Sequence, residues 1–443
     1  MKKDHLPLVR IFFISLVLLF LFGCSGQQAS HETSGLEEVF RSPGEFEKHE
    51  AIWIGWSTYE IKKGLSTAPV HLKMIEELVP YVQVKIAVQG SDETNTVKSL
   101  LKENNIPIRN VSFPVIPHGD IWFRDMGPIF IISNKGRLKI VDFNFNSWGS
   151  ELHSSSFARL EEKVDRLVAK EMGIETIMTR LISEGGNREF NGRGVMMTVE
   201  TVELQRNPNL PRDEIEAEFK RLFGVKKVIW LKKGIYEDDF TSLGTVPGPD
   251  GEPNAYRTTT TGGHIDELCR FADANTILLA QVTPEEAEKG LIARENRLRL
   301  EENFKILENS TDQDGNPFKI VRMPHPETIY YALEPGDLTY DFISGLNYKD
   351  GSVFPKGKKV KVIPAMSYLN FAVTNEIVLA PKYWKPGLPE IIKQKDEQAV
   401  KTLQSVFPDR KIVAIDTITI NLGGGGLHCI TQHEPAAESF QVR

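Results

Sequence analysis

The stretch from Gly423 to Gln432 has the most unusual composition in the chain. Four consecutive glycines precede Leu427, His428 and Cys429. Runs of glycine weaken helices and strands, so they indicate a place where the backbone turns tightly or closely approaches another group. The Gly-Lys-Ser/Thr that a phosphate-binding loop needs after its glycines is absent. Most free cysteines are small buried hydrophobes, but beside such a loop the thiol of Cys429 is a candidate nucleophile.

A nucleophilic thiolate needs a proton donor or acceptor, and the sequence Gly263-His264-Ile265-Asp266 offers one. Residues two apart on a strand share a face, so we expect His264 and Asp266 to point the same way. Cys269 has the opposite parity and is expected to face the packed side. A His/Asp pair could instead bind a metal, but the chain has no HExxH motif and no dense histidine cluster. We therefore expect no metal and no organic cofactor.

Asp125 completes this set within Trp122-Phe-Arg-Asp-Met-Gly-Pro128. Taken alone, an Arg-Asp pair is as consistent with a surface ion pair as with a functional site. Asp125 and Asp266 together suit a planar cation, because two carboxylates can hydrogen-bond a guanidinium in fork geometry and hold its carbon before a sulfur. The combination predicts nucleophilic chemistry on a guanidinium group.

The elements that position these residues alternate along the chain. A helical pattern followed by a short apolar strand recurs six times without a linker-like boundary, which predicts an α/β fold in a single domain. The expected helices cover residues 70–80, 93–104, 157–172, 212–223, 284–308 and 394–406. The expected strands cover residues 82–88, 108–113, 174–182, 225–231, 318–321 and 411–415.

Five polar or glycine-bearing segments recur in step with these elements, each beside apolar, strand-like sequence. They are residues 118–125, 184–187, 262–266, 367–370 and 423–429. Five similar units could place these segments around one axis, where their side chains would converge on one pocket. The alternative is a doubly wound open sheet, but its glycine fingerprint is absent from the expected place.

The first residues have the pattern of an export signal. Basic residues precede an apolar run at 11–22, and Leu21-Phe22-Gly23-Cys24 resembles a bacterial lipobox. The run is shorter than the roughly 18 residues of a membrane span. An ordinary secretory signal with a chance cysteine is the alternative. The expected organisation is a lipoprotein signal peptide at 1–23, a tether at 24–40 lipidated on Cys24, and a catalytic domain at 41–443, anchored at the periplasmic or outer surface of a bacterial envelope.

Composition excludes several classes of protein. Of the 443 residues, 40% are hydrophobic and 26% charged, as in ordinary globular proteins rather than disordered ones. Three cysteines in so long a chain exclude a disulfide scaffold. A net charge of −7 argues against a nucleic-acid partner.

These motifs resemble those of agmatine deiminases and the Porphyromonas-type peptidylarginine deiminases grouped with them. The further segments that carry the resemblance are Asn146-Ser-Trp-Gly149, Glu184-Gly-Gly186, Arg206-Asn-Pro208 and Ser367-Tyr-Leu-Asn-Phe371. The similarity runs in order from about residue 40 to residue 435. It implies the pentein fold, a five-bladed α/β propeller.

The resemblance also implies roles for single residues. Cys429 would be the nucleophile, His264 the general acid and base, and Asp125 with Asp266 the guanidinium clamp. The implied substrate-binding residues are Trp122, Glu184 and Asn370. The Gly/Pro-rich insert Phe240 to Gly262 would be a lid or an entry loop.

The implied reaction is hydrolysis of a guanidinium to a ureido group, with release of ammonia through a covalent thiouronium. Overall similarity favours agmatine and N-carbamoylputrescine, a step in putrescine biosynthesis, whereas the exported setting favours arginine in peptides. Free arginine is a further option. A papain-type hydrolase usually has its cysteine before its histidine, the reverse of His264 and Cys429. A non-catalytic lipoprotein that binds polyamines or arginine is the last alternative.

Overall fold

A central strand in each of five sheets pairs antiparallel with one neighbour and parallel with the other. The central strands are β2 (His49–Gly55), β6 (Leu138–Asp142), β9 (Val195–Val199), β13 (Thr276–Gln281) and β18 (Ile377–Lys382). Their antiparallel neighbours are β20 (Thr431–Pro435), β5 (Ile129–Ser133), β8 (Glu189–Phe190), β12 (Cys269–Phe271) and β17 (Ala372–Thr374). Their parallel neighbours are β3 (Gln83–Ala87), β7 (Glu175–Met178), β10 (Lys227–Leu231), β14 (Lys319–Pro324) and β19 (Lys411–Asp416).

The structure is a computed structural model that describes residues 37–56, 58–150 and 155–437. From Glu38 onward, the described residues form one compact unit of mixed α/β structure. The expected signal peptide, Cys24 and most of the tether lie outside the described residues and stay predictions. Among the residues described, no helix combines the length and the apolar sequence needed to cross a membrane.

Helices connect each central strand to its parallel neighbour, because parallel strands need a long crossover. These helices are α1 (Thr58–Lys62), α2 (Ala68–Leu78), α5 (Ser156–Glu161), α6 (Val164–Met172), α7 (Glu200–Arg206), α8 (Arg212–Phe223), α9 (Pro284–Ala287), α10 (Leu291–Glu308) and α12 (Glu390–Val406). The central strands are covered by this packing, and all five residues of β9 are buried. The chain therefore consists largely of five β-β-α-β units.

The first of these units is completed by the end of the chain. Strand β20 is the antiparallel partner of β2, so residues near the two ends of the described chain share one sheet. The short strands β1 (Phe40–Arg41) and β4 (Val111–Ser112) extend two of the sheets at their edges. The remaining α-helices are α3 (Ser91–Glu103), α4 (Phe123–Met126), α11 (Leu338–Ser344) and α13 (Ile418–Gly423).

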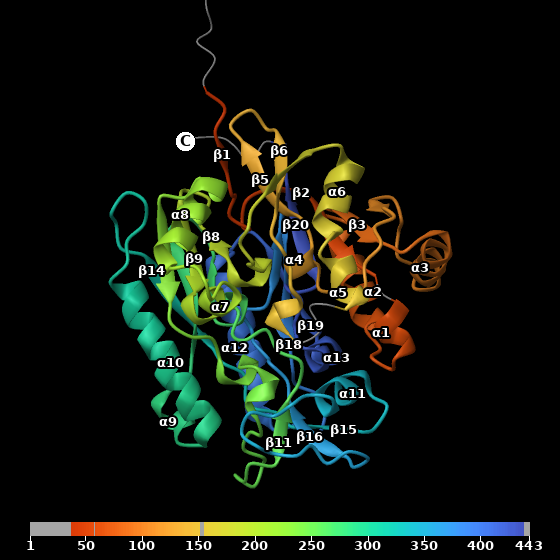
Figure 1. The fold of residues 1–443 in the computed structure, drawn as a ribbon, viewed down its shortest axis with the longest axis vertical. Coiled ribbons are helices and arrows are strands. Elements are labelled where there is room, and N and C mark those ends of the chain that lie inside the picture. The colour runs from red at the N-terminus through yellow and green to blue at the C-terminus, as the bar shows by residue number, and fades with distance from the viewer. Residues whose placement is uncertain (1–36, 57, 151–154, 438–443) are drawn as a thin grey trace, which may run out of the picture. The chain divides into compact units, whose positions relative to one another are not determined.

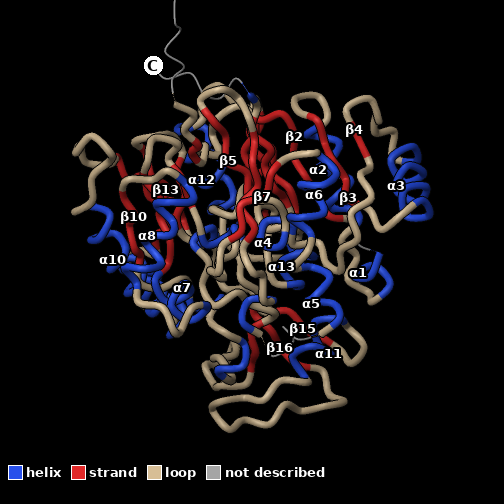
Figure 2. The backbone as a smooth tube through the Cα atoms, turned by 45° about the horizontal axis from the view of Figure 1, so that its top comes forward, coloured by secondary structure: helices blue, strands red, loops and turns tan. Residues whose placement is uncertain are grey.

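A sixth sheet lies outside this repeat. It contains β11 (Ala255–Arg257), β15 (Tyr331–Leu333) and β16 (Val360–Ile363), and it lies with α11 at one end of the unit (Figures 1 and 2). Strand β11 comes from the insert Phe240 to Gly262, so this insert forms part of a sheet. Its expected function as a lid or entry loop stays a prediction.

Several expected elements match closely and others are interrupted. The helices at 212–223 and 394–406 are confirmed as α8 and α12. The expected helix at 157–172 is two helices, α5 and α6. The expected helix at 284–308 is also two helices, α9 and α10, and the backbone between them is extended at Gly290. The strand at 108–113 shortens to β4. The alternative of one open doubly wound sheet is wrong, since the described strands form six small sheets.

Candidate active site

Each of the five polar segments lies directly before the antiparallel strand of one unit. The segments 118–125, 184–187, 262–266, 367–370 and 423–429 precede β5, β8, β12, β17 and β20 respectively. Because each segment has the same place in its unit, the five segments come together in the folded chain. Each segment contributes one residue to a single buried cluster. The cluster contains Asp125, Gly186, Asp266, Asn370 and Cys429. The expected convergence of five segments on one place is therefore found in the structure.

Gly186 lies at the point where three side chains meet. A Cβ atom at this position would lie 2.6 Å from His264 Nδ1, 2.9 Å from Asp125 Oδ1 and 3.2 Å from Asp266 Oδ2. The backbone N–H of Gly186 donates a 2.8 Å hydrogen bond to Asp125 Oδ1. A glycine is required here because any side chain would occupy the space between the histidine and the two carboxylates.

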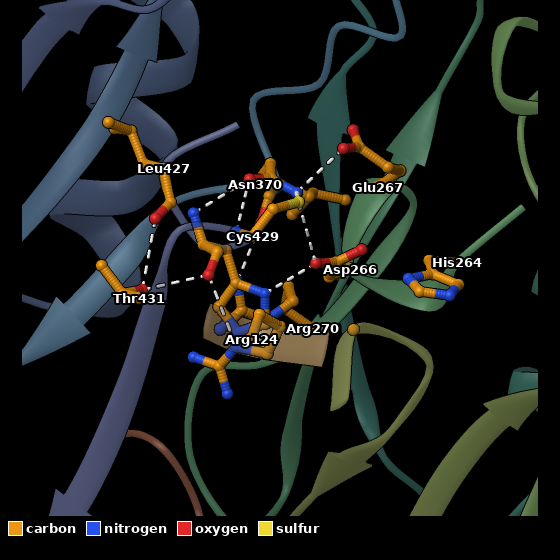
Figure 3. A network of polar contacts seen from close by, with 12 residues as sticks. Arg124, His264, Asp266, Glu267, Arg270, Asn370, Leu427, Cys429 and Thr431 are labelled. Carbon is orange, nitrogen blue, oxygen red and sulfur yellow. Dashed lines mark hydrogen bonds and ion pairs between the residues drawn. The ribbon is translucent and has the colours of Figure 1, made fainter. Parts of the chain in front are cut away.

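Cys429 is 5% exposed and lies against Asp266 and Asn370 (Figure 3). Its Sγ is 3.6 Å from Asp266 Oδ2, and the Nδ2 of Asn370 donates to Sγ at 3.0 Å. Burial raises the pKa of this thiol well above its usual value, and the carboxylates of Asp266, Glu267 and Asp125 raise it further. The thiol is therefore protonated until a positive charge arrives beside it.

The glycine loop allows Trp122 and Cys429 to approach each other. A Cβ at Gly425 would lie 2.6 Å from the Trp122 ring and 3.1 Å from Cys429 Sγ. Trp122 is 7% exposed and packs in the same apolar cluster as Cys429. It therefore lies where the expected wall of the site would be.

The segment that carries His264 and Asp266 is not a strand, contrary to expectation. Gly262 and Gly263 have φ angles of 92° and 108°, which interrupt extended structure, and Ile265–Glu267 form a 3-10 turn. Asp238 fixes this turn, because its Oδ2 accepts hydrogen bonds from the backbone N–H groups of Gly263 and His264. The side chains of His264 and Asp266 still converge, but through the turn rather than through strand parity.

His264 lies between two carboxylates and is almost completely buried. Its Nε2 is 3.3 Å from Glu184 Oε2, and its Nδ1 is 3.7 Å from Asp125 Oδ2. Burial on its own lowers the pKa of His264, but Asp125, Glu184 and Asp266 outweigh it and raise this pKa to about 9. His264 is therefore an imidazolium at neutral pH and can donate a proton.

The two carboxylates of the expected clamp have different electrostatics. Burial raises the pKa of Asp125, whose Oδ2 accepts a 2.8 Å hydrogen bond from Trp148 Nε1. Burial acts in the same direction on Asp266, but His428, with its Nδ1 at 2.7 Å from Oδ2, lowers the pKa of Asp266 below its usual value. Asp266 is thus the more firmly ionised of the pair.

The expected substrate-binding residues have different positions in the cluster. Glu184 contacts His264 and Arg206, whose Nε lies 2.6 Å from its Oε1. The pKa of Glu184 is lowered to about 2, because Arg206 and His264 outweigh the effect of burial. Asn370 lies nearer the reaction centre, with its Nδ2 at 3.0 Å from Cys429 Sγ and 2.9 Å from Glu267 Oε1.

Several residues in the cluster were not identified from the sequence. Arg124, Trp148 and His428 lie within the sequence motifs at 122–128, 146–149 and 423–432, and this location is the signal by which the sequence could identify them. Arg270 has the same strand parity as His264 and Asp266, which was its signal, whereas Glu45 carried none. Glu45 accepts from Arg124 and Arg270 at 2.5 Å each and lies 3.0 Å from His428 Nε2.

The second cysteine of the described chain is separate from this cluster. Cys269 is fully buried in the main hydrophobic core, with its Sγ 3.9 Å from Met197 Sδ. Burial raises the pKa of its thiol well above the usual value. Cys269 therefore packs in the core, as expected.

Two groups of side chains in the described residues could bring three metal-ligand atoms within 4.8 Å of one another. The first is Glu45, Glu189 and His428, but Arg124 and Arg270 already pair with Glu45. The second is Asp266, Glu267 and Cys429 and contains no histidine. The expectation that no metal is used stays a prediction.

Comparison with known proteins agrees with this geometry. Residues 41–244 and 252–435 match the family model described as Porphyromonas-type peptidyl-arginine deiminase, and the gap falls within the insert. The agmatine deiminase of Pseudomonas aeruginosa is 28% identical over 403 residues, 90% of this chain and 96% of that protein. The agmatine deiminase of Medicago truncatula is 28% identical over 416 residues, again 90% of this chain and 96% of that protein.

A solved structure shares the fold. The structure of a cysteine-to-serine variant of the C. jejuni agmatine deiminase with substrate bound has a TM-score of 0.65 and 25% identity, and the alignment covers 90% of this chain and 96% of that one. The motifs, the fold and the match over most of the chain agree. The chain belongs to the Porphyromonas-type peptidyl-arginine deiminase family.

Proposed function

We propose that this protein is a hydrolase that converts a guanidinium to a ureido group and releases ammonia, with agmatine as its substrate and N-carbamoylputrescine as its product. The observation that carries the proposal is the meeting of His264, Asp125 and Asp266 around Gly186, with the sulfur of Cys429 at 3.6 Å from Asp266. The relatives named agmatine deiminase support the choice of substrate.

In the proposed reaction, Asp125 and Asp266 hold the guanidinium plane. The arriving positive charge favours ionisation of Cys429, whose proton is released to solvent, and the thiolate attacks the guanidinium carbon. His264, which carries a proton at neutral pH, donates it to the departing nitrogen, so ammonia leaves and a thiouronium remains. The neutral His264 then takes a proton from water, which attacks the same carbon and releases the ureido product and the sulfur.

Burial of the site favours a small substrate. Cys429, His264, Asp125 and Asp266 are each at most 7% exposed. Agmatine can enter as a free molecule, whereas an arginine in a folded protein would bring a bulky main chain with it. Arginine in peptides is the second candidate, because the matching family model is described by that activity.

Release of ammonia from agmatine, free arginine and an arginyl peptide by the purified protein tests these substrates side by side. Agmatine is expected to give the highest kcat/KM. A higher kcat/KM for the peptide would reverse the order of the two candidates. No ammonia from any of the three, from a preparation kept reduced, would refute hydrolysis and favour a binding protein.

We also propose that the five units are blades of a propeller around this site. The completion of the first sheet by β20 supports the proposal, because it joins the last unit to the first. The equivalent positions of the five polar segments support it as well.

We further propose that the chain is exported and held at the bacterial envelope by lipid on Cys24. The apolar run at 11–22 and the lipobox-like sequence that ends at Cys24 are its support. In this proposal residues 1–23 are removed, residues 24–40 act as a tether, and the catalytic domain starts at residue 41.

A further inference from the structure

Short polar contacts join three side chains in a row, Asp266 of the clamp, His428 and Glu45. His428 Nδ1 lies 2.7 Å from Asp266 Oδ2, and His428 Nε2 lies 3.0 Å from each carboxylate oxygen of Glu45. His428 is fully buried and directly precedes Cys429 in the sequence. An imidazole therefore connects the clamp carboxylate of Asp266 to a second carboxylate, that of Glu45.

Both ring nitrogens of His428 lie within hydrogen-bond distance of a carboxylate. A carboxylate only accepts hydrogen bonds, so His428 is the donor in each of these contacts that is made. Burial raises the pKa of Glu45, but Arg124, His428, His433 and Arg270 outweigh it and lower this pKa well below its usual value. His428 also lowers the pKa of Asp266. The imidazole is therefore the bridge that couples Asp266 to Glu45.

Glu45 in turn joins the three segments that carry the reacting groups. It contacts Arg124, which precedes Asp125, and it contacts His428, which precedes Cys429. It also contacts Arg270, four residues after Asp266. One carboxylate thereby holds neighbours of both clamp residues and of the nucleophile in a common arrangement.

Asp266 keeps one oxygen available despite these contacts. Its Oδ2 accepts from His428 and from the thiol of Cys429, whereas its Oδ1 has no hydrogen-bond partner among the described residues. A buried acceptor without a partner is costly, unless a ligand supplies the donor. The N–H groups of a guanidinium are donors of this kind.

We propose that His428, held by Glu45, is a positioning residue that keeps Asp266 anionic and leaves its Oδ1 free to accept a guanidinium N–H. This inference rests on the proposed function. The other charged or titratable groups that face Asp266 are Asp125, His264, Glu267, Arg270 and Cys429. Those that face His428 from other elements are Glu189 and His433.

The pH profile of kcat/KM tests this role with His428→Gln. A glutamine amide can still donate a hydrogen bond to Asp266 but carries no charge, so Asp266 would take up a proton at higher pH. In wild type the acid limb is expected to follow Asp125, whose pKa is raised. In His428→Gln, protonation of Asp266 is expected to join it, so the limb moves upward and becomes steeper, as loss of an adjacent opposite charge predicts. Glu45→Gln is expected to move the acid limb in the same direction. A substitution that only damages the structure of the site would instead lower kcat/KM by the same factor at every pH.

Two controls separate this effect from general damage. His71→Gln alters another buried histidine, which hydrogen-bonds the Thr67 carbonyl outside the site, and should leave the acid limb in place. In an Asp266→Asn background, His428→Gln should cause no further movement of the limb, because the group it acts on is gone. An unmoved limb in active His428→Gln would overturn the inference.

Alkylation of Cys429 gives a readout that needs no turnover and covers a variant with no measurable activity. Chloroacetamidine carries an amidinium that the clamp can bind, whereas iodoacetamide is neutral. At a pH on the acid limb, where Asp266 takes up a proton in the variant, His428→Gln is expected to lower the chloroacetamidine rate relative to the iodoacetamide rate by up to about tenfold for each pH unit that the titration of Asp266 moves. Equal ratios in wild type and variant refute the inference. If the wild type hydrolyses no guanidinium but the ratio still depends on His428, the proposed function fails and the role of His428 stands.

Discussion

The side-chain amide of Asn370 donates a 3.0 Å hydrogen bond to the sulfur of Cys429 from a segment 59 residues earlier in the chain. The carbonyl oxygen of the same amide accepts from the backbone N–H of His428. Asn370 therefore holds both the nucleophile and the loop that presents it. Among the described residues, the sulfur of Cys269 instead contacts Met197 Sδ in the core, and no side-chain amide donates to it.

This difference predicts distinct behaviour for the two cysteines. Cys429→Ser should lose nearly all turnover, because a hydroxyl is a far weaker nucleophile. Cys269→Ser should keep the chemistry and lose some stability, since it places a hydroxyl in a packed apolar position. Peptide mapping after treatment with a haloacetamidine should find label on Cys429 alone, and substrate should protect it. Label on Cys269, or an active Cys429→Ser protein, would contradict the assignment.

Loss of either clamp carboxylate should impair turnover without unfolding the protein. Asp125→Asn and Asp266→Asn each remove one anionic partner of a desolvated cation, at a cost of about 2–5 kcal/mol, or roughly 30-fold to several-thousand-fold in kcat/KM. Steady-state kinetics on agmatine, with circular dichroism as a check of folding, measures this. The clamp assignment is wrong if either folded variant retains a near-normal kcat/KM.

The space above Gly186 predicts a sharp effect of a single methyl group. Gly186→Ala would place a Cβ 2.6 Å from His264 Nδ1 and should displace the groups that hold the substrate. A misplacement of this size is expected to lower kcat/KM roughly 100-fold. Gly290→Ala is the matched control, because its Cβ would meet nothing within 4 Å. Equal activity of the two variants would mean that the substrate does not occupy this space.

The raised pKa of His264 predicts a loss of stability in alkaline solution. The imidazolium is stabilised in the folded state up to a pKa of about 9, above its unfolded value of about 6.5. This contribution is present in full below pH 6.5 and is lost as the pH rises through 9, by up to about 3 kcal/mol. Denaturant unfolding at pH 6, 8 and 10 should show a smaller decrease for His264→Asn than for wild type.

His71→Asn is the control for this measurement. Burial lowers the pKa of His71, so its contribution changes on the acid side and should leave the alkaline decrease intact. Parallel curves for wild type and His264→Asn above pH 7 would show that His264 is neutral in the folded protein.

Substitution of Cys24 is expected to change where the protein is held, and to leave its enzymatic activity unchanged. Cys24→Ser should release the protein from the membrane fraction and abolish incorporation of a radiolabelled fatty acid, because the lipid provides the anchor. The activity of the purified catalytic domain should equal that of wild type. A Cys24→Ser protein that still incorporates the label would disprove lipidation at this residue.

Local sequence patterns determined the types of element and the segments that carry chemistry. The 3.6-residue periodicity of α8 and α12 and the apolar runs of β3 and β10 depend on neighbouring residues, so a sequence shows them directly. The five polar segments, and the choice of Cys429 over Cys269, followed from the same local information. The expected strand at His264 was wrong because two glycines with positive φ turn the backbone, and residue types do not reveal their φ angles.

Tertiary structure alone decided the partners and charges of the site. Glu45 and His428 are 383 residues apart in sequence, and no local pattern indicates that they touch. The contacts of Glu184 with His264 and Arg206 have the same origin. The pKa of Asp125 is raised and that of Asp266 is lowered, although both are buried aspartates, because only Asp266 is paired with His428. A pKa depends on burial and on charges brought close by folding, and these are properties of the packed chain.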